Sequence, residues 1–168
     1  NEVNIVDKPM VMNYDGLNIG LLPWIAEDNE EESLEFINNC NASIIGAHLE
    51  LQGFEMSKGM PCVDGMSRQP FEKFEMVLTG HFHSKSNQGN IHYLGAQMEF
   101  FWNDCDDPKY FHILDTETRQ IEKIQNTYTL FEKIVYNDKE VCYNNYNKNL
   151  SKKFVKVVVA EKTDPFTF

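Results

Sequence analysis

Three of the five histidines in this sequence stand where a metal site could form. His48 directly follows the short apolar run of residues 43–47, and His81 follows a second such run, residues 76–79, after one glycine. His83 comes two positions later. Functional side chains of α/β proteins gather at the carboxyl ends of strands, and imidazole binds divalent transition metals well. The sequence therefore predicts that His48, His81 and His83 are metal ligands.

The spacing of His81 and His83 suits a site with two metal ions. Residues two apart in an extended segment point the same way, with α-carbons roughly 7 Å apart, and paired ions in phosphoesterases lie roughly 3.5–4 Å apart. The two rings could thus reach neighbouring ions, and Gly80 would let the backbone turn tightly there. An isolated His-x-His is more often an ordinary surface feature, but the shared context with His48 favours a metal site.

The other histidines and two carboxylates show no comparable pattern. His92 and His112 lie inside strand-like runs, so we expect them to face outward or be satisfied locally rather than to bind metal. Glu50 and Asp104 lie in expected loops, where carboxylates are usually solvated, and neither is given a role.

Large aromatic side chains are assigned to the core, because they dominate core packing. This expectation covers residues 100–102 (Phe-Phe-Trp), placed under the sheet in preference to stacking on bases, and Trp24. The sequence contains no glycine-rich phosphate loop and no nucleophile elbow.

Short strands and one helix would position the histidines. Period and turn residues predict a helix over 27–39, a short helix over 71–74, a long loop over 52–70, and an antiparallel pattern from residue 90 onward. The expected strands cover residues 3–6, 17–25, 43–47, 76–79, 90–94, 110–114, 121–124, 131–136 and 153–160. The Asn-rich stretch between the last two strands reads as a linker.

Composition sets limits on function. The 168 residues are 42% hydrophobic and carry a net charge of -11, which is typical of a globular domain and argues against a generic basic nucleic-acid binder. No apolar run approaches the roughly 20 residues of a membrane span, so no membrane partner is expected. Four scattered cysteines predict free thiols in a reducing compartment. Because the chain opens at Asn1 and ends at Phe168, both just beside strand-like segments, we expect truncation at both ends.

Several motifs resemble one known family. Residues 80–83 (GHFH) followed by 91–95 (IHYLG) resemble the last metal motif of calcineurin-like metallophosphoesterases, in the form found in SbcD-type nucleases. Residues 46–50 (GAHLE) with 58–60 (KGM) resemble the preceding motif as it occurs in the recombination nucleases of T-even-like phages. The resemblance runs over nearly the whole chain.

The resemblance implies a fold and a set of ligands. It implies an α/β fold, the four-layer α/β/β/α sandwich, of which residues 1–137 would be the C-terminal half, 138–150 a linker and 151–168 the start of a capping domain. In that family His48 and His81 would bind one metal and His83 the other, with Mn²⁺ the best match to mixed imidazole and oxygen ligands. The family's Asp-x-His, bridging Asp and Asn-His-Asp motifs are absent, so the catalytic residues are expected before Asn1 and the fragment alone is expected to be inactive.

The function implied is that of a metal-dependent DNA nuclease subunit. It would act in the cytoplasm of a bacterial or phage-infected cell, with DNA as substrate and with an SbcC-like ATPase and a second copy of itself as partners. Two alternatives stay open, because the metal motif does not name the substrate. One is a phosphomonoesterase on the same scaffold, and the other is a degenerate, non-catalytic phosphoesterase fold that serves as a binding scaffold.

Overall fold

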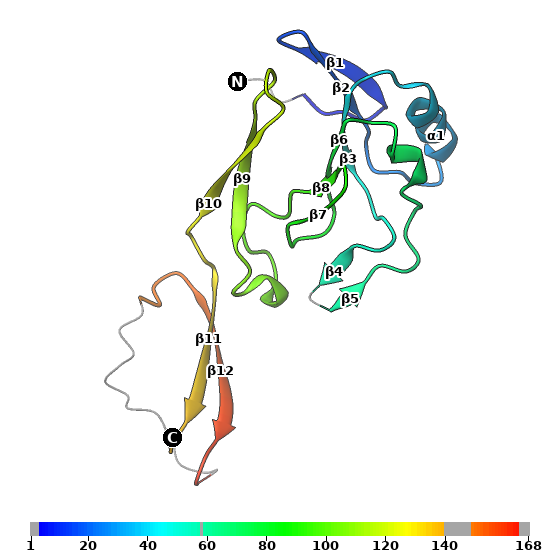
Figure 1. Cartoon of the computed structure of the whole chain (residues 1–168). Coiled ribbons are helices and arrows are strands. Elements are labelled where there is room, and N and C mark those ends of the chain that lie inside the picture. Colours follow the sequence, from blue (N-terminus) through cyan, green and yellow to red (C-terminus); the bar gives the residue numbers. More distant parts are fainter. Residues whose placement is uncertain (1–3, 58, 140–148, 165–168) are drawn as a thin grey trace.

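The fold is built mainly from strands (Figure 1). A computed structural model describes residues 4–57, 59–139 and 149–164. The elements in chain order are β1 (Met10–Tyr14), β2 (Leu17–Leu21), α1 (Glu30–Asn39), β3 (Ile44–His48), β4 (Glu55–Ser57), β5 (Met60–Pro61), the 3₁₀ turn η1 (Gln69–Phe71), β6 (Met76–Gly80), β7 (Ser86–Gln88), β8 (Ile91–Tyr93), η2 (Trp102–Asp104), β9 (Lys109–Leu114), β10 (Ile121–Asn126), β11 (Phe131–Asn137) and β12 (Phe154–Glu161). No helix in the described ranges is long and apolar enough to cross a membrane.

A six-stranded mixed sheet with the order β1-β2-β3-β6-β8-β7 forms the centre of the fold. Its four inner strands run parallel, and the edge strands β1 and β7 pair antiparallel with their neighbours. The prediction of an antiparallel pattern from residue 90 is confirmed for the pairs β7–β8 and β9–β10. It is wrong for the pairs β6–β8 and β11–β12, which are parallel. The described residues form a strand-rich fold with one α-helix, and the α/β class with its four-layer sandwich stays a prediction.

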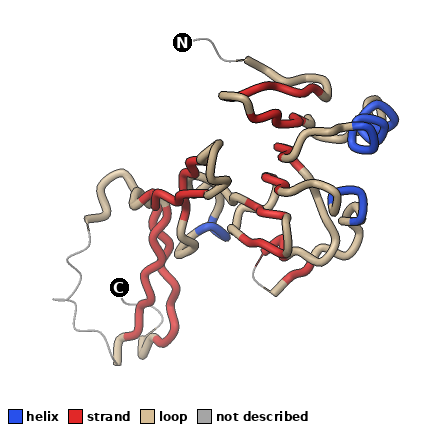
Figure 2. Tube along the Cα trace, turned by 45° about the horizontal axis from the view of Figure 1, so that its top comes forward, coloured by secondary structure: helices blue, strands red, loops and turns tan. Residues whose placement is uncertain are grey.

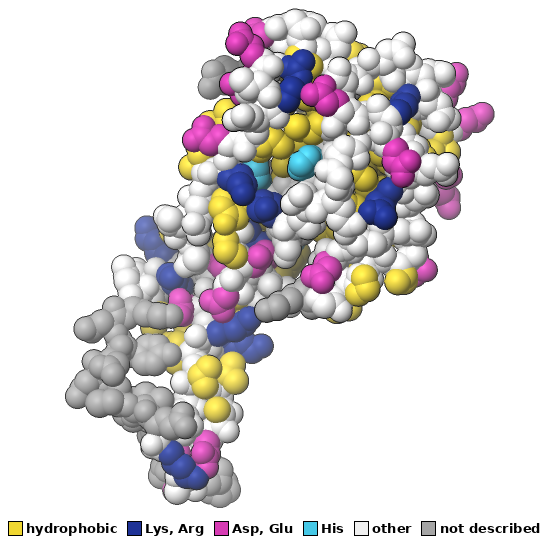
Figure 3. All heavy atoms as spheres, in the orientation of Figure 1, with side chains coloured by type: hydrophobic (Ala, Val, Ile, Leu, Met, Phe, Trp, Pro, Cys, Tyr) yellow, Lys and Arg dark blue, Asp and Glu magenta, His cyan; other side chains and the backbone are white. Residues whose placement is uncertain are grey.

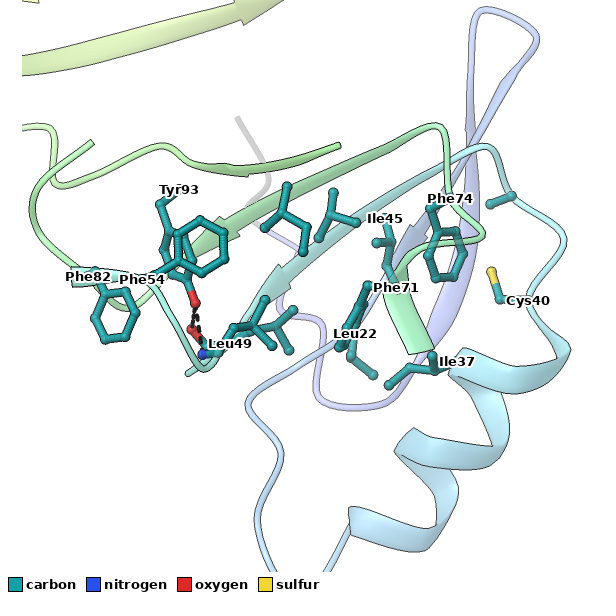
Figure 4. Packing of buried hydrophobic residues seen from close by; sticks show 14 of the residues in the cluster. Leu22, Ile37, Cys40, Ile45, Leu49, Phe54, Phe71, Phe74, Phe82 and Tyr93 are labelled. Carbon is teal, nitrogen blue, oxygen red and sulfur yellow. Dashed lines mark hydrogen bonds between the residues drawn. The ribbon is translucent and has the colours of Figure 1, made fainter. Parts of the chain in front are cut away.

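Both faces of the sheet are covered. Alternate residues of its inner strands point to opposite faces, so neighbouring residues belong to different cores. Ile45 and Val77 are fully buried in the larger core with Ile37 of α1 (Figure 4). The neighbouring Ile44 and Met76 face a smaller cluster, which includes side chains of β9 and β10. Figure 1 accordingly shows α1 and the β9–β10 hairpin on opposite sides of the sheet.

Boundaries differ from the sequence-based expectation mostly at the start of the chain. The described residues 4–6 are not in a strand, and the turn at Asp15 and Gly16 instead follows β1 (Met10–Tyr14). The strand expected over 17–25 ends at Leu21, two residues before Pro23, which lacks an N–H to donate.

Two ribbons lie beyond the central sheet. β9 pairs antiparallel with β10, and β11 pairs in parallel with β12. Figures 1 and 2 both show the β11–β12 ribbon projecting away from the six-stranded sheet. It joins strands from either side of the expected linker, most of which lies outside the described residues, so the predicted domain boundary stays a prediction. Within the expected loop 52–70, β4 and β5 form a short hairpin.

Candidate metal site

The rings of His48 and His81 meet at the carboxyl edge of the central sheet. His48 ends β3 and is paired in register with Gly80, the last residue of the parallel strand β6. The ring centroids of His48 and His81 lie 5.4 Å apart, with the planes at 87°. Adjacent parallel strands thus bring together two of the three predicted ligands, which lie 33 residues apart in the sequence.

Gly80 makes room for this pair. A Cβ placed on Gly80 would lie 2.9 Å from Nδ1 of His48, so any larger residue would push that ring away. The tight backbone turn expected at Gly80 falls instead on His81, whose φ is 93°. Non-glycine residues rarely adopt positive φ, and such strain is concentrated at functional sites.

The pocket around His48 favours the neutral imidazole. Burial lowers the pKa of His48, and the positive charge that His81 can carry lowers that pKa further. A neutral ring keeps a lone pair for a cation. Trp24 lies against both rings, with centroid distances of 5.3 Å to His48 and 4.9 Å to His81.

The hydroxyl of Tyr93 holds the backbone that follows His48 through two hydrogen bonds. It donates to the carbonyl of Leu49 at 2.8 Å and accepts from the N–H of Leu51 at 3.0 Å (Figure 4). Burial raises the pKa of Tyr93 well above its usual value, so the phenol stays protonated and makes both bonds. The backbone at the end of β3 is thereby fixed to β8.

His83 is held by a buried carboxylate. Its Nδ1 lies 3.0 Å from Oδ1 and 3.1 Å from Oδ2 of Asp104. Lys109 also donates to the carboxylate, with Nζ 3.0 Å from Oδ1, and it donates to the backbone oxygen of His83 at 3.1 Å. The ring of His83 is stacked on Phe101 at a centroid distance of 5.6 Å.

The charge of Asp104 determines which ring nitrogen of His83 carries the proton and which keeps a lone pair. Burial raises the pKa of this carboxyl, but N–H donors of Phe100 and Phe101, the ammonium of Lys109 and the ring of His83 outweigh burial and lower the pKa to about 2. An ionised carboxylate can only accept hydrogen bonds. Nδ1 of His83 therefore carries a proton, and in the neutral ring Nε2 keeps the lone pair.

His81 and His83 share a hollow of about 550 Å³, which also contains Asp104, Asp106 and Asp107. His48 lines a separate hollow of about 200 Å³. Within the part of the chain that the structure describes, no three His, Cys, Asp or Glu side chains are grouped closely enough to hold a metal ion. His48 and His81 are in ring contact, whereas His83 shares a hollow with His81 but not with His48, so the joint ligand role of the three histidines stays a prediction.

Sequence reasoning missed the surroundings of these rings. Asp104 was expected to be solvated but is 3% exposed, because two backbone N–H groups and Lys109 replace its water. The core assignment of the aromatics is wrong for Trp24, Phe100 and Phe101, which are 46%, 52% and 64% exposed and lie beside the histidines. A Pro-Trp pair directly after a strand could have signalled the first of them.

The other histidines and the cysteines agree better with expectation. His92 and His112 lie half-buried in β8 and β9, inside the strands in which they were expected. Free thiols are confirmed for Cys40, Cys62 and Cys105, all of them buried; Cys142 lies outside the described residues.

Comparison with known proteins relates the chain to a phage exonuclease subunit. The relative is Exonuclease subunit 1 of Enterobacteria phage T4, which is 37% identical over 160 residues, or 95% of this chain. The match covers 46% of that relative, so the chain spans about half of its length. No protein-family model matches. The relationship to a phage exonuclease subunit is therefore established, and the calcineurin-like assignment stays a prediction.

Proposed function

We propose that this chain forms the metal-binding part of a DNA nuclease subunit that hydrolyses phosphodiester bonds. One observation carries the proposal: His48 and His81 meet at the carboxyl ends of adjacent parallel strands, 5.4 Å between ring centroids. Strand ends of this kind are where α/β proteins place their active sites. The relationship to Exonuclease subunit 1 supports a nuclease over a phosphomonoesterase.

The three imidazole rings are a suitable type of ligand for a divalent transition-metal cation. His48 is held in the form with a free lone pair, and Asp104 leaves Nε2 of His83 free. A carboxylate behind a ligating imidazole is the usual arrangement in metal sites. Three histidines are only part of a two-metal ligand set, so the proposal requires oxygen ligands in addition to these imidazoles. Two Mn²⁺ ions, when bound, would activate water and stabilise charge on the phosphate oxygens.

The protein's own residues position these ligands. Gly80 and Trp24 fix the ring of His48, while Asp104 and Phe101 fix the ring of His83. A preorganised site of this kind loses little entropy when a cation binds.

The remaining parts of the proposal follow the family resemblance. They are the four-layer sandwich, the capping domain after residue 150, an SbcC-like ATPase partner, a possible homodimer and action in the cytoplasm. The printed name of the relative, a subunit, supports a complex with another protein.

Nuclease activity is tested with a protein of the relative's length that contains this chain. With Mn²⁺ and linear DNA, we expect release of nucleotides that is abolished by His81→Ala and by His83→Ala but retained by Glu35→Ala on the exposed face of α1. Turnover of a small phosphomonoester without DNA cleavage, or full activity in both histidine variants, would contradict the proposal.

A further inference from the structure

A further cavity lies on the other side of the sheet from α1. It has a volume of about 250 Å³ and lies between β7–β8 and the β9–β10 hairpin. We call it the basic pocket; its polar lining consists of Lys85, Ser86, Asn87, His92, His112 and Lys123, with Tyr93 also contributing. Figure 3 shows histidine and basic side chains together in a hollow between these elements.

The basic pocket concentrates positive charge in an acidic protein. Lys85 and Lys123 form no ion pair with any described residue, and no described Asp or Glu lines the cavity. The chain as a whole carries a net charge of -11, so two lysines without a neutralising carboxylate are unexpected. Unpaired cations that face a common cavity attract an anion.

A buried hydroxyl supports the same conclusion. Oγ of Ser86 is out of contact with solvent and has no hydrogen-bond partner among the described residues. Buried polar atoms are nearly always hydrogen-bonded, so an exception needs an explanation. A rotation of the Ser86 side chain would be needed for its hydroxyl to donate to an anionic oxygen in the cavity.

The histidines of the pocket respond to the lysine charges. Burial, and next to it the charge of Lys85, lowers the pKa of His92. Burial, followed by the charges of Lys85 and Lys123, lowers the pKa of His112. Both lysines thus act on the interior of the cavity, where a bound anion would offset them.

We propose that the basic pocket binds a phosphate group of a nucleic acid strand. The cavity is smaller than the roughly 300 Å³ at which pockets for whole small ligands begin, which fits one backbone unit of a longer strand. Lys85 follows His83 by two residues, so the pocket and the candidate metal site are joined by one short segment. The choice of nucleic acid as ligand rests on the proposed nuclease function, and it gives this acidic chain a local surface for the DNA backbone.

Binding tests the proposal without any need for catalysis. The 168-residue chain is titrated with a fluorescent single-stranded oligonucleotide in the presence of EDTA, and inorganic phosphate is titrated separately. Replacing both lysines (Lys85→Gln with Lys123→Gln) should raise the oligonucleotide Kd roughly tenfold. It should also reduce the slope of log K against log salt by about 0.7, as expected for the loss of one phosphate contact to a single strand.

Matched variants separate this site from general charge. The control changes Lys8 and Lys133, which are exposed and lie outside the pocket, to Gln with the same loss of charge; it should bind like the wild type. Arg at both pocket positions should retain binding. Equal affinity of pocket and control variants, or binding of phosphate without binding of the oligonucleotide, would overturn the proposal. Because no cleavage is measured, pocket-dependent binding stands even if the longer protein proves not to be a nuclease.

Discussion

The carboxylate of Asp104 contacts Nδ1 of His83 through both oxygens, at 3.0 and 3.1 Å. The two residues are 21 positions apart, and η2 (Trp102–Asp104) delivers the carboxylate to the ring. The contact fixes the orientation of the imidazole as well as its tautomer, because only Nδ1–H can donate to an ionised acid. Asp104 is thus a positioning residue for a candidate ligand.

Asp104→Asn should weaken Mn²⁺ binding and mix the tautomers of His83, because an amide can donate as well as accept. It should also lower the free energy of unfolding by roughly 2–3 kcal/mol, since a buried charged partner is lost. Histidine ¹⁵N NMR reports the tautomer, and urea denaturation reports stability. Asp106→Asn, an exposed change in the same hollow, is the control; equal behaviour of the two variants would contradict the role of Asp104.

Acid should remove the contribution of Asp104 to stability. Its pKa falls from the ordinary 3.8 to about 2 in the folded protein. A carboxyl group whose pKa is lower in the folded than in the unfolded protein stabilises the fold at pH values above its unfolded pKa. This contribution of Asp104, about 2 kcal/mol, is therefore present above pH 4. It is lost as the pH falls from about 4 to about 2. Denaturant midpoints measured across this window should fall more steeply for the wild type than for Asp104→Asn; parallel curves would exclude the shift.

The position of His48 and His81 at the ends of strands could be predicted from the sequence, and their role as metal ligands stays a prediction. Short apolar runs that stop at His48 and near His81 are visible without a structure, and parallel pairing of β3 with β6 brings them together. The parallel pairing of β8 was missed because a three-residue strand has too few residues to show a period. The four-layer arrangement came from the resemblance alone and stays a prediction.

The surroundings of the ligands could not be predicted for a physical reason. Whether a carboxylate such as Asp104 is buried depends on donors from distant segments, here Lys109 and two backbone N–H groups, and a linear sequence does not show them. Aromatic residues such as Phe101 and Trp24 have the composition of a core even when they line a site. The aromatic character of Phe101 and Trp24 therefore predicted burial in the core, whereas both side chains are exposed beside the histidines.

His81→Gly should separate stability from metal binding. His81 has φ of 93°, a conformation that costs a non-glycine residue roughly 1–3 kcal/mol and glycine much less. Relief of strain should offset the lost ring contacts, leaving the unfolding free energy equal to the wild type or up to about 1 kcal/mol higher, while Mn²⁺ affinity falls. Calorimetric titration and thermal unfolding measure the two quantities. A large loss of stability would show that the ring of His81 is structural.

Gly80→Ala should displace the ring of His48. The added Cβ would lie 2.9 Å from Nδ1 of His48, whereas the matched change Gly46→Ala meets only the flexible end of Leu21, at 3.3 Å. We expect weaker Mn²⁺ binding and a shifted His48 ring signal for the change at Gly80 alone. Identical histidine spectra for the two variants would show that the close approach has no consequence.

The most direct test of the account is a Mn²⁺ titration of the ¹⁵N-labelled chain, followed through the five histidine ring signals. A paramagnetic ion broadens the signals nearest to it first, so weak binding by a partial ligand set is still detected. We predict that His48, His81 and His83 broaden at lower Mn²⁺ concentrations than His92 and His112. Equal or earlier broadening of His92 and His112 would contradict the metal site at the carboxyl edge of the sheet.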